Sequence, residues 1–269
     1  MKNFLSIDQG TTSSRSIIFD ANLNLVTDAQ EEYDLTYPED GWVELEPKKI
    51  IETVTNTLNK VVSADIGLEA CGITNQRETT IVWSKSTGEA IYPGIVWQDR
   101  RTHEYCSYLK SNGHEPVIKE KTGLLLDPYF SATKIKWILD NVDGAREKAS
   151  KGELLFGTVD SYLIYMLSQE KNHFTDVTNA SRTLLFNIKS MEWDDELLEL
   201  FEIPKTMMPE VLSCDGDFGN LKINDCEIPI RGVIGDQQAA LVGQGCFNNG
   251  DMKSTYRTGC FLMVNTCLL

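Results

Sequence analysis

The segment Asp8–Ser14 carries side chains suited to phosphate and metal chemistry. An aspartate follows a short apolar run and enters a turn that contains a glycine and several hydroxyl groups. Gly10 lets the backbone approach a ligand, and neighbouring hydroxyl and amide groups could surround phosphate oxygens. Asp8 could hold Mg²⁺ through water. The candidate phosphate ligands are Thr11, Thr12, Ser13 and Arg15. The alternative is a hairpin turn whose hydroxyl groups make only local bonds.

A second polar segment, Asn75–Glu78, lies between two apolar runs that are typical of strands. Arg77 and Glu78 offer planar donors and acceptors side by side, which suits the neutral hydroxyl groups of a polyol. The alternative is a solvated hairpin turn with a surface ion pair, a feature of small energetic weight. The residues alone leave both interpretations open.

Aromatic residues accompany polar ones in two further segments. Trp97 ends an apolar run and could form a pocket wall against the carbon edge of a polyol. The alternative is a core tryptophan followed by a helix N-cap at Asp99. Tyr129 precedes a helix that Ser131 could cap, and its hydroxyl group could face a cleft. The pattern of that helix, taken alone, is typical of a structural element.

The segment Gly235–Ala240 places an aspartate where a strand ends and a helix begins. The run Ile230–Ile234 is a predicted strand, and ligands of open α/β sheets lie beyond the carboxyl ends of such strands. Asp236 could therefore position a substrate hydroxyl group and accept its proton. The alternative is that Asp236 only caps the following helix.

The composition limits the classes of partner. The chain has 269 residues, 41% hydrophobic and 24% charged, and its formal net charge is −15. So acidic a surface argues against binding to nucleic acids or anionic membranes. No apolar run could span a bilayer and no apolar signal segment opens the sequence, so we expect no membrane insertion and a cytoplasmic location. The seven cysteines contain no CxxC pair and are expected to be reduced.

Hydrophobic patterning predicts an α/β fold that positions these segments. The predicted strands cover residues 3–7, 15–20, 25–33, 70–74, 79–83, 91–97 and 229–234. The predicted helices cover residues 47–64, 102–112, 132–141, 143–150, 158–168, 194–201 and 237–243. Polar segments that directly follow strands should lie at one edge of the sheet.

A weak internal repeat relates the two ends of the sequence. A strand, a turn with glycine and threonine, and a second strand occur at residues 3–20 and again at residues 252–264. The second copy predicts the start of another structural unit. With Phe247–Gly250 as the boundary, we expect residues 1–246 to form one domain and residues 247–269 to begin a second.

Taken together and in this order, nine segments resemble the glycerol kinases, a group within the FGGY carbohydrate kinase family. They are Asp8–Arg15, Gly72–Trp83, Ile95–Thr102, Tyr129–Asn141, Gly157–Leu167, Thr175–Phe186, Asp194–Pro204, Gly235–Gly245 and Lys253–Phe261. The run Tyr129–Asn141 fits the family signature at each constrained position. The resemblance implies a ribonuclease H-like (actin-like ATPase) domain with a mixed sheet, followed by the opening hairpin of a second domain.

The resemblance also implies a reaction, in which the γ-phosphoryl group of ATP passes to glycerol and gives sn-glycerol 3-phosphate for glycerol catabolism. Asp236 would be the catalytic base, and Asp8 and Asp236 would hold Mg²⁺. The glycerol-binding residues would be Arg77, Glu78, Trp97, Tyr129, Asp236, Gln237 and Phe261. The residues that contact the phosphates of ATP would be Thr11, Thr12, Ser13, Arg15 and Thr258.

The sequence departs from the family pattern in two respects. Kinases of this kind are about twice as long, with ATP mainly on a second domain that is largely missing here, so we expect this chain to be inactive alone. Arg257 also stands where the family usually has glycine, in a Gly-Thr-Gly turn over the phosphates.

Other interpretations therefore stay open. One is a non-catalytic glycerol-binding fragment, which could complement a separately encoded C-terminal half. Another is a degenerate truncated product, and a third is a kinase of the same family for another sugar, such as xylulose or gluconate. The sequence does not decide whether the protein forms a homo-oligomer.

Overall fold

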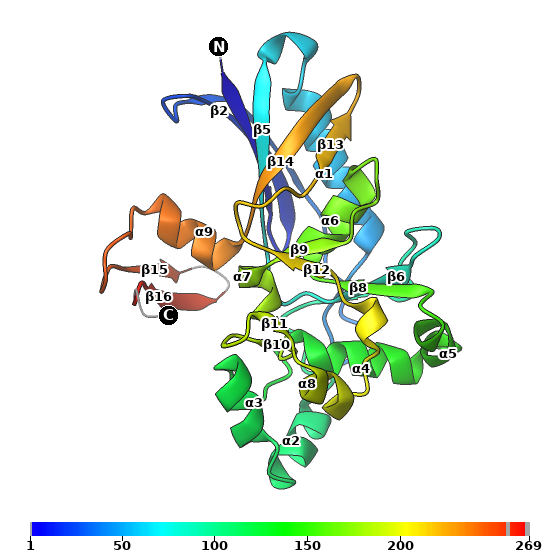
Figure 1. The fold of residues 1–269 in the computed structure, drawn as a ribbon. Helices are drawn as coiled ribbons and strands as arrows, with labels where there is room; N and C mark the ends of the chain where they lie inside the picture. Colours follow the sequence, from blue (N-terminus) through cyan, green and yellow to red (C-terminus); the bar gives the residue numbers. More distant parts are fainter. Residues whose placement is uncertain (1, 257–258, 267–269) are drawn as a thin grey trace.

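The computed structural model describes residues 2–256 and 259–266, and its centre is a mixed β-sheet (Figure 1). Within these residues, the sheet has the strand order β13 (Asn220–Ile223), β14 (Cys226–Gly235), β5 (Leu68–Asn75), β1 (Asn3–Gln9), β2 (Ser13–Asp20) and β3 (Leu25–Glu32). Strands β14, β5 and β1 run parallel to one another, and the outer strands pair antiparallel with their neighbours. The predicted α/β class with a mixed sheet is confirmed.

Two helices cover the sheet, one with an apolar stripe and one buried nearly all round. Helix α1 (Pro47–Val61) packs against β2 and β3 through side chains such as Ile50 and Val54, and its proline occupies the first turn, where no backbone N–H is needed. Helix α6 (Val159–Leu167) packs against β5 and β13. The alternating buried residues of the strands complete this first hydrophobic core.

A second hydrophobic core lies among helices in the lower part of Figure 1. Its helices are α2 (His103–Ser111), α3 (Glu115–Thr122), α4 (Ser131–Asn141), α5 (Ala145–Ser150) and α8 (Asp195–Leu200). They pack beside the antiparallel pair β6 (Ile81–Ser84) and β8 (Leu154–Gly157). Shorter elements connect the two cores: η1 (Ala64–Ile66), α7 (Val177–Ala180), η2 (Lys205–Met207) and the strand pairs β4–β7 (Glu44–Leu45, Gly94–Ile95), β9–β12 (Phe174–Asp176, Glu210–Leu212) and β10–β11 (Phe186–Asn187, Glu192–Trp193).

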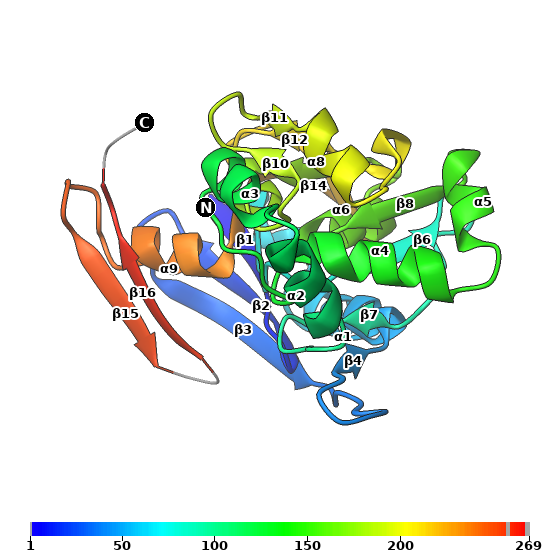
Figure 2. The ribbon, with the colours of Figure 1, turned by 90° about the horizontal axis from the view of Figure 1, so that it is seen from below.

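The last described elements lie to one side of the sheet. Helix α9 (Asp236–Gly243) follows directly after β14, and the hairpin of β15 (Met252–Tyr256) and β16 (Cys260–Val264) packs against it (Figure 2). No helix in residues 2–256 and 259–266 has the length and apolar character that a bilayer crossing needs.

Several predicted element boundaries were wrong. Strand β1 continues through Asp8 to Gln9 because the parallel strand β5 pairs with it along this whole length. Strands β5 and β6 do not form a hairpin, since β6 pairs with β8 in a separate sheet. The predicted strand over residues 91–97 contains only the two-residue β7. Helix α3, which buries only two side chains, was not predicted.

Candidate active site

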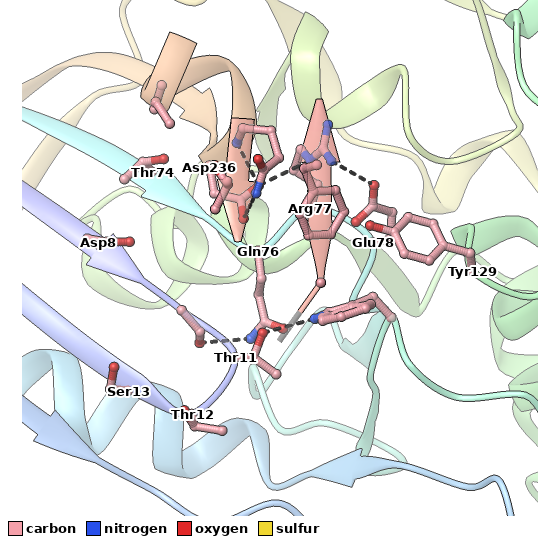
Figure 3. Close-up of a pocket in the computed structure, with 18 residues that line it drawn as sticks. Asp8, Thr11, Thr12, Ser13, Thr74, Gln76, Arg77, Glu78, Tyr129 and Asp236 are labelled. Carbon is pink, nitrogen blue, oxygen red and sulfur yellow. Dashed lines mark hydrogen bonds and ion pairs between the residues drawn. The ribbon is translucent and has the colours of Figure 1, made fainter. Parts of the chain in front are cut away.

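Most of the predicted site residues meet in one pocket of about 380 Å³ at the carboxyl ends of β1, β5 and β14 (Figure 3). These three parallel strands end at the same edge of the sheet, so the residues that follow them become neighbours in space. The predicted residues that line the pocket are Asp8, Thr11, Thr12, Ser13, Arg77, Glu78, Trp97, Tyr129, Asp236, Gln237 and Phe261.

The Arg77–Glu78 pair forms the buried floor of this pocket, with side-chain exposures of 4% and 2%. The Arg77 guanidinium lies between two carboxylates, 3.1 Å from Asp236 (Nε to Oδ1) and 3.5 Å from Glu78 (Nη2 to Oε1). Arg182 donates a hydrogen bond of 2.7 Å from Nε to Glu78 Oε1. The alternative of a solvated turn with a surface ion pair is therefore wrong.

Asp236 is the first residue of α9, and its carboxylate faces the pocket beside Arg77 (Figure 3). The N-cap position belongs to Gly235, so capping does not explain the aspartate. Burial raises the pKa of Asp236; Arg77 opposes this rise, whereas the negative charge of Glu78 adds to it. A carboxylate with a raised pKa is a stronger proton acceptor, as a general base requires.

Three aromatic rings form a second wall of the pocket. Trp97 lies edge-on to Tyr129, at 5.7 Å between ring centroids, and to Phe261, at 6.2 Å. The indole N–H of Trp97 donates a 2.9 Å hydrogen bond to Thr11 Oγ1, which connects this wall to the turn after β1. Burial also raises the pKa of Tyr129, so that its hydroxyl group stays neutral.

Two predicted helix caps were wrong. Asp99 lies well before α2, whose N-cap is Thr102, and its carboxylate accepts hydrogen bonds from the backbone N–H of Val43 and from Arg101. Ser131 is already inside α4 and makes no side-chain cap bond.

The turn between β1 and β2 is held from behind by buried side chains. The carbonyl group of Gly10 accepts hydrogen bonds from the Tyr33 hydroxyl group, at 2.7 Å, and from Gln76 Nε2, at 3.1 Å. Its backbone N–H donates to the carbonyl of Ser13 at 2.9 Å. The turn thus presents its hydroxyl groups to the pocket from a fixed backbone.

Not every predicted phosphate ligand lies in the pocket. Arg15 is absent from its lining, and its guanidinium pairs with Asp28 on the exposed face of β3 at 2.7 Å. Thr258 and Arg257 lie outside the described residues, so their predicted roles stay predictions.

The oxygen ligands of the pocket fit a magnesium ion. Asp8 and Asp236 both line it, and within the described part of the chain no group of three or more His, Cys, Asp or Glu residues gathers to form a closed metal cage. Mg²⁺ is usually bound in proteins by one or two carboxylates, with water and phosphate oxygens completing its shell.

Sequence reasoning missed several polar residues of the site. Thr74, Gln76 and Thr255 line the pocket without having been assigned a role, and Gln238 accepts a hydrogen bond from Arg77 Nη1. Gln76 stood inside a segment that had been singled out. Arg182 carried no signal, because a single arginine in a polar stretch has no distinctive spacing.

This fold and this site define the class of protein. Residues 3–243 match the N-terminal domain of the FGGY family of carbohydrate kinases, and the chain belongs to this family. The resemblance seen in the sequence is therefore confirmed.

Similar proteins narrow the comparison to one group within the family. The chain is 57% identical to a glycerol kinase of Alteromonas mediterranea, over 98% of this chain and 55% of the relative. It is 56% identical to a glycerol kinase of Oceanobacillus iheyensis, over 98% of this chain and 54% of the relative. The chain spans about half the length of the curated relatives it matches.

Solved structures agree with the fold. The Plasmodium falciparum glycerol kinase with ADP aligns with a TM-score of 0.94 at 36% identity, over 98% of this chain and 54% of that one. A gluconate kinase from Lactobacillus acidophilus aligns with a TM-score of 0.86 at 21% identity, over 97% and 53%, and shows the shared fold alone. The predicted ribonuclease H-like, actin-like domain is confirmed.

Proposed function

We propose that this chain provides the glycerol-binding part of an ATP-dependent glycerol kinase. The observation that carries the proposal is the single pocket in which Arg77, Glu78 and Asp236 face an aromatic wall. Planar charged groups on one side suit three hydroxyl groups, and rings on the other side suit a carbon edge. Gln237, which lines the same pocket, would share in holding these hydroxyl groups.

The reaction would be an in-line transfer to one hydroxyl group of glycerol. That oxygen forms a bond to the γ-phosphorus of ATP, the bond from this phosphorus to the bridging oxygen breaks, and ADP leaves. The proton of the hydroxyl group goes to Asp236, whose raised pKa suits it to accept one. Before the transfer, the Arg77 guanidinium neutralises part of the negative charge of the Asp236 carboxylate. It also keeps this carboxylate oriented.

The turn between β1 and β2 would hold the phosphates of ATP. Thr11, Thr12 and Ser13 line the pocket beside Asp8, and Arg15 would have to leave Asp28 to take part. Asp8 and Asp236 would hold Mg²⁺, which supplies neutralisation of phosphate charge when bound. Thr258, which lies outside the described residues, would be a further phosphate contact.

The division into residues 1–246 and residues 247–269 is part of this proposal, as is a cytoplasmic location, where ATP and Mg²⁺ are abundant. A C-terminal half from a separate chain and a homo-oligomer are further arrangements compatible with it. The chain spans about half the length of the curated relatives it matches, and an assay decides whether this span turns over alone.

Titration of the chain with glycerol tests the binding proposal. We expect weak saturable binding in calorimetry or in NMR spectra of the ¹⁵N-labelled chain, lowered about tenfold or more in Glu78→Gln, because a buried acceptor is lost beside the polyol. Glu153→Gln, at an exposed position far from the pocket, is the matched control. Absence of binding by the wild-type chain at high glycerol would reject the proposal.

Incubation with Mg-ATP tests the expectation of inactivity and the choice of substrate. Turnover with glycerol at about 0.1–1 s⁻¹ or faster, a small fraction of ordinary kinase rates, would show that the chain is active alone. A panel of glycerol, xylulose and gluconate in the binding experiment should give a response to glycerol only. A stronger response to either sugar compound would move the proposal to another kinase of the family.

A further inference from the structure

Lys134 is a fully buried lysine in helix α4, next to the pocket but not part of its lining. Its side chain has no exposure, and no carboxylate of the described residues lies within ion-pair distance of its ammonium group. Buried ammonium groups are costly unless hydrogen bonds compensate for lost water. A position of this kind needs a reason beyond packing, since an apolar residue would fill it at lower cost.

The ammonium group connects two backbone segments that carry proposed substrate ligands. Lys134 Nζ donates one hydrogen bond to the carbonyl oxygen of Glu78, at 3.0 Å, and one to that of Tyr129, at 2.8 Å. Glu78 lies in the link between β5 and β6, whereas Tyr129 lies just before α4. These segments are far apart in the sequence, and their side chains face each other in the pocket (Figure 3).

The charges around Lys134 act in both directions. Burial is the main influence and lowers the pKa of Lys134 to about 7; the carboxylates of Glu78, Asp99 and Asp127 raise it, and the guanidinium of Arg101 lowers it further. The two hydrogen bonds to carbonyl oxygens favour the charged form, because a charged donor bonds more strongly than a neutral one.

We propose that Lys134 is a positioning residue of the polyol site, which sets the distance between Glu78 and Tyr129 by holding both of their carbonyl groups. This inference rests on the proposed glycerol binding and adds to it a residue that does not touch the ligand. Loss of the ammonium group frees two buried carbonyls to move, so both ligand side chains lose their mutual register. A misplacement of ligand groups by about 1 Å reduces binding and reactivity strongly.

The test compares Lys134→Met with Lys136→Met in the same chain. Both variants replace a lysine of α4 by a chain of similar length, but Lys136 pairs with Asp140 and Glu202 on the outer side of the helix. Glycerol affinity is measured by NMR titration well below each melting temperature. We expect about tenfold weaker binding in Lys134→Met and unchanged binding in Lys136→Met.

The pH profile separates positioning from bulk stability. Wild-type affinity for glycerol should fall more steeply than that of Lys134→Met as the pH rises through about 7, where Lys134 loses its proton. Asp160, whose pKa burial also raises to about 7, is common to both proteins and cancels in the difference. Equal affinity in wild type and Lys134→Met, or parallel profiles, would overturn the inference while leaving the proposed function intact. No binding by the wild type would instead overturn the proposed function, and the inference with it.

A folding failure is also decisive. If Lys134→Met does not fold, Lys134→Gln, which keeps amide donors at this site, takes its place in the same titration. If neither variant folds while Lys136→Met does, Lys134 serves the core and not the ligand site, and the inference is rejected.

Discussion

At the scale of single residues, the carboxyl group of Asp236 is controlled by two neighbours of opposite charge. Burial raises the pKa of Asp236. The positive charge of Arg77 lowers this pKa, and the negative charge of Glu78 raises it further. We therefore predict opposite effects from two substitutions. Arg77→Met should raise the pKa of Asp236, and Glu78→Gln should lower it. An NMR titration of the Asp236 side-chain carbon measures both.

Shifts in the same direction would contradict this account of the site, because they would report a general change in burial instead of individual charges. The proton-accepting form of Asp236 exists above its pKa, so in a reconstituted kinase the rate should rise with pH through that pKa. Arg77→Met should move this rise to higher pH, and Glu78→Gln to lower pH.

The sequence allowed most pocket residues to be predicted, because they cluster in short polar segments at strand ends. It did not reveal which charges are buried. Lys134 stands four residues before Ile138 in a predicted helix, but its spacing does not show that its ammonium group is buried. Arg77 and Glu78 equally fit a solvated turn. Arg15 was placed with the phosphates, whereas its guanidinium pairs with Asp28 on the next strand. Partners on other strands are not visible in local spacing.

At the scale of elements, the junction of β14 and α9 needs a glycine. A Cβ atom on Gly235 would lie 2.5 Å from Cδ and 2.7 Å from Cγ of Arg77. Gly235→Ala should therefore push Arg77 away from Asp236 and weaken glycerol binding about tenfold. Gly243→Ala, in the same helix with open space around its Cα, should bind like the wild type. Equal affinities in the two variants would contradict the close approach.

The turn between β1 and β2 offers a second test at this scale. The Tyr33 hydroxyl group donates to the carbonyl of Gly10 and accepts from Gln9 Nε2 at 2.6 Å, both in a buried setting. Tyr33→Phe should lower the free energy of unfolding by about 1–2 kcal/mol, as measured in urea. Tyr37→Phe, at a side chain with 69% exposure, should change it little, and a similar loss in both would contradict the role of the buried hydroxyl group.

Most strands and helices were predictable from periodicity, but their partners were not. A hairpin at the β5–β6 link was one of the two interpretations that the sequence left open, because two apolar runs flank a short polar segment. In the structure β6 pairs with β8, more than 70 residues later. Pairing over such distances depends on packing of the whole core, and a single sequence carries no direct signal for it.

At the scale of the whole molecule, a buried carboxyl group should make stability depend on pH. Burial and the nearby Asp176 raise the pKa of Asp160 from its ordinary value of 3.8 to about 7. The folded state thus holds this proton more tightly than the unfolded state. The stabilisation that the protonated Asp160 side chain gives the folded state is complete below pH 3.8, the ordinary pKa of an aspartate. It is lost as the pH rises towards 7.

Urea unfolding of wild type and Asp160→Asn at several pH values measures this effect. The free energy of unfolding of the wild type should fall relative to the variant between about pH 4 and 7, by about 1.4 kcal/mol per pH unit at most. His173, whose pKa burial lowers to about 4, has the opposite effect, but it is common to both proteins and cancels in the difference. Asp143→Asn, at an exposed position, should run parallel to the wild type.

The strand order of the central sheet also has a consequence for biosynthesis. Strand β14 completes the sheet beside β5, yet roughly 150 residues separate the two along the chain. At ordinary elongation rates a ribosome needs about ten seconds or more to add that length. During this interval the edge of β5 that later pairs with β14 is exposed on the nascent polypeptide. A chaperone that shields this edge should raise the yield of native protein.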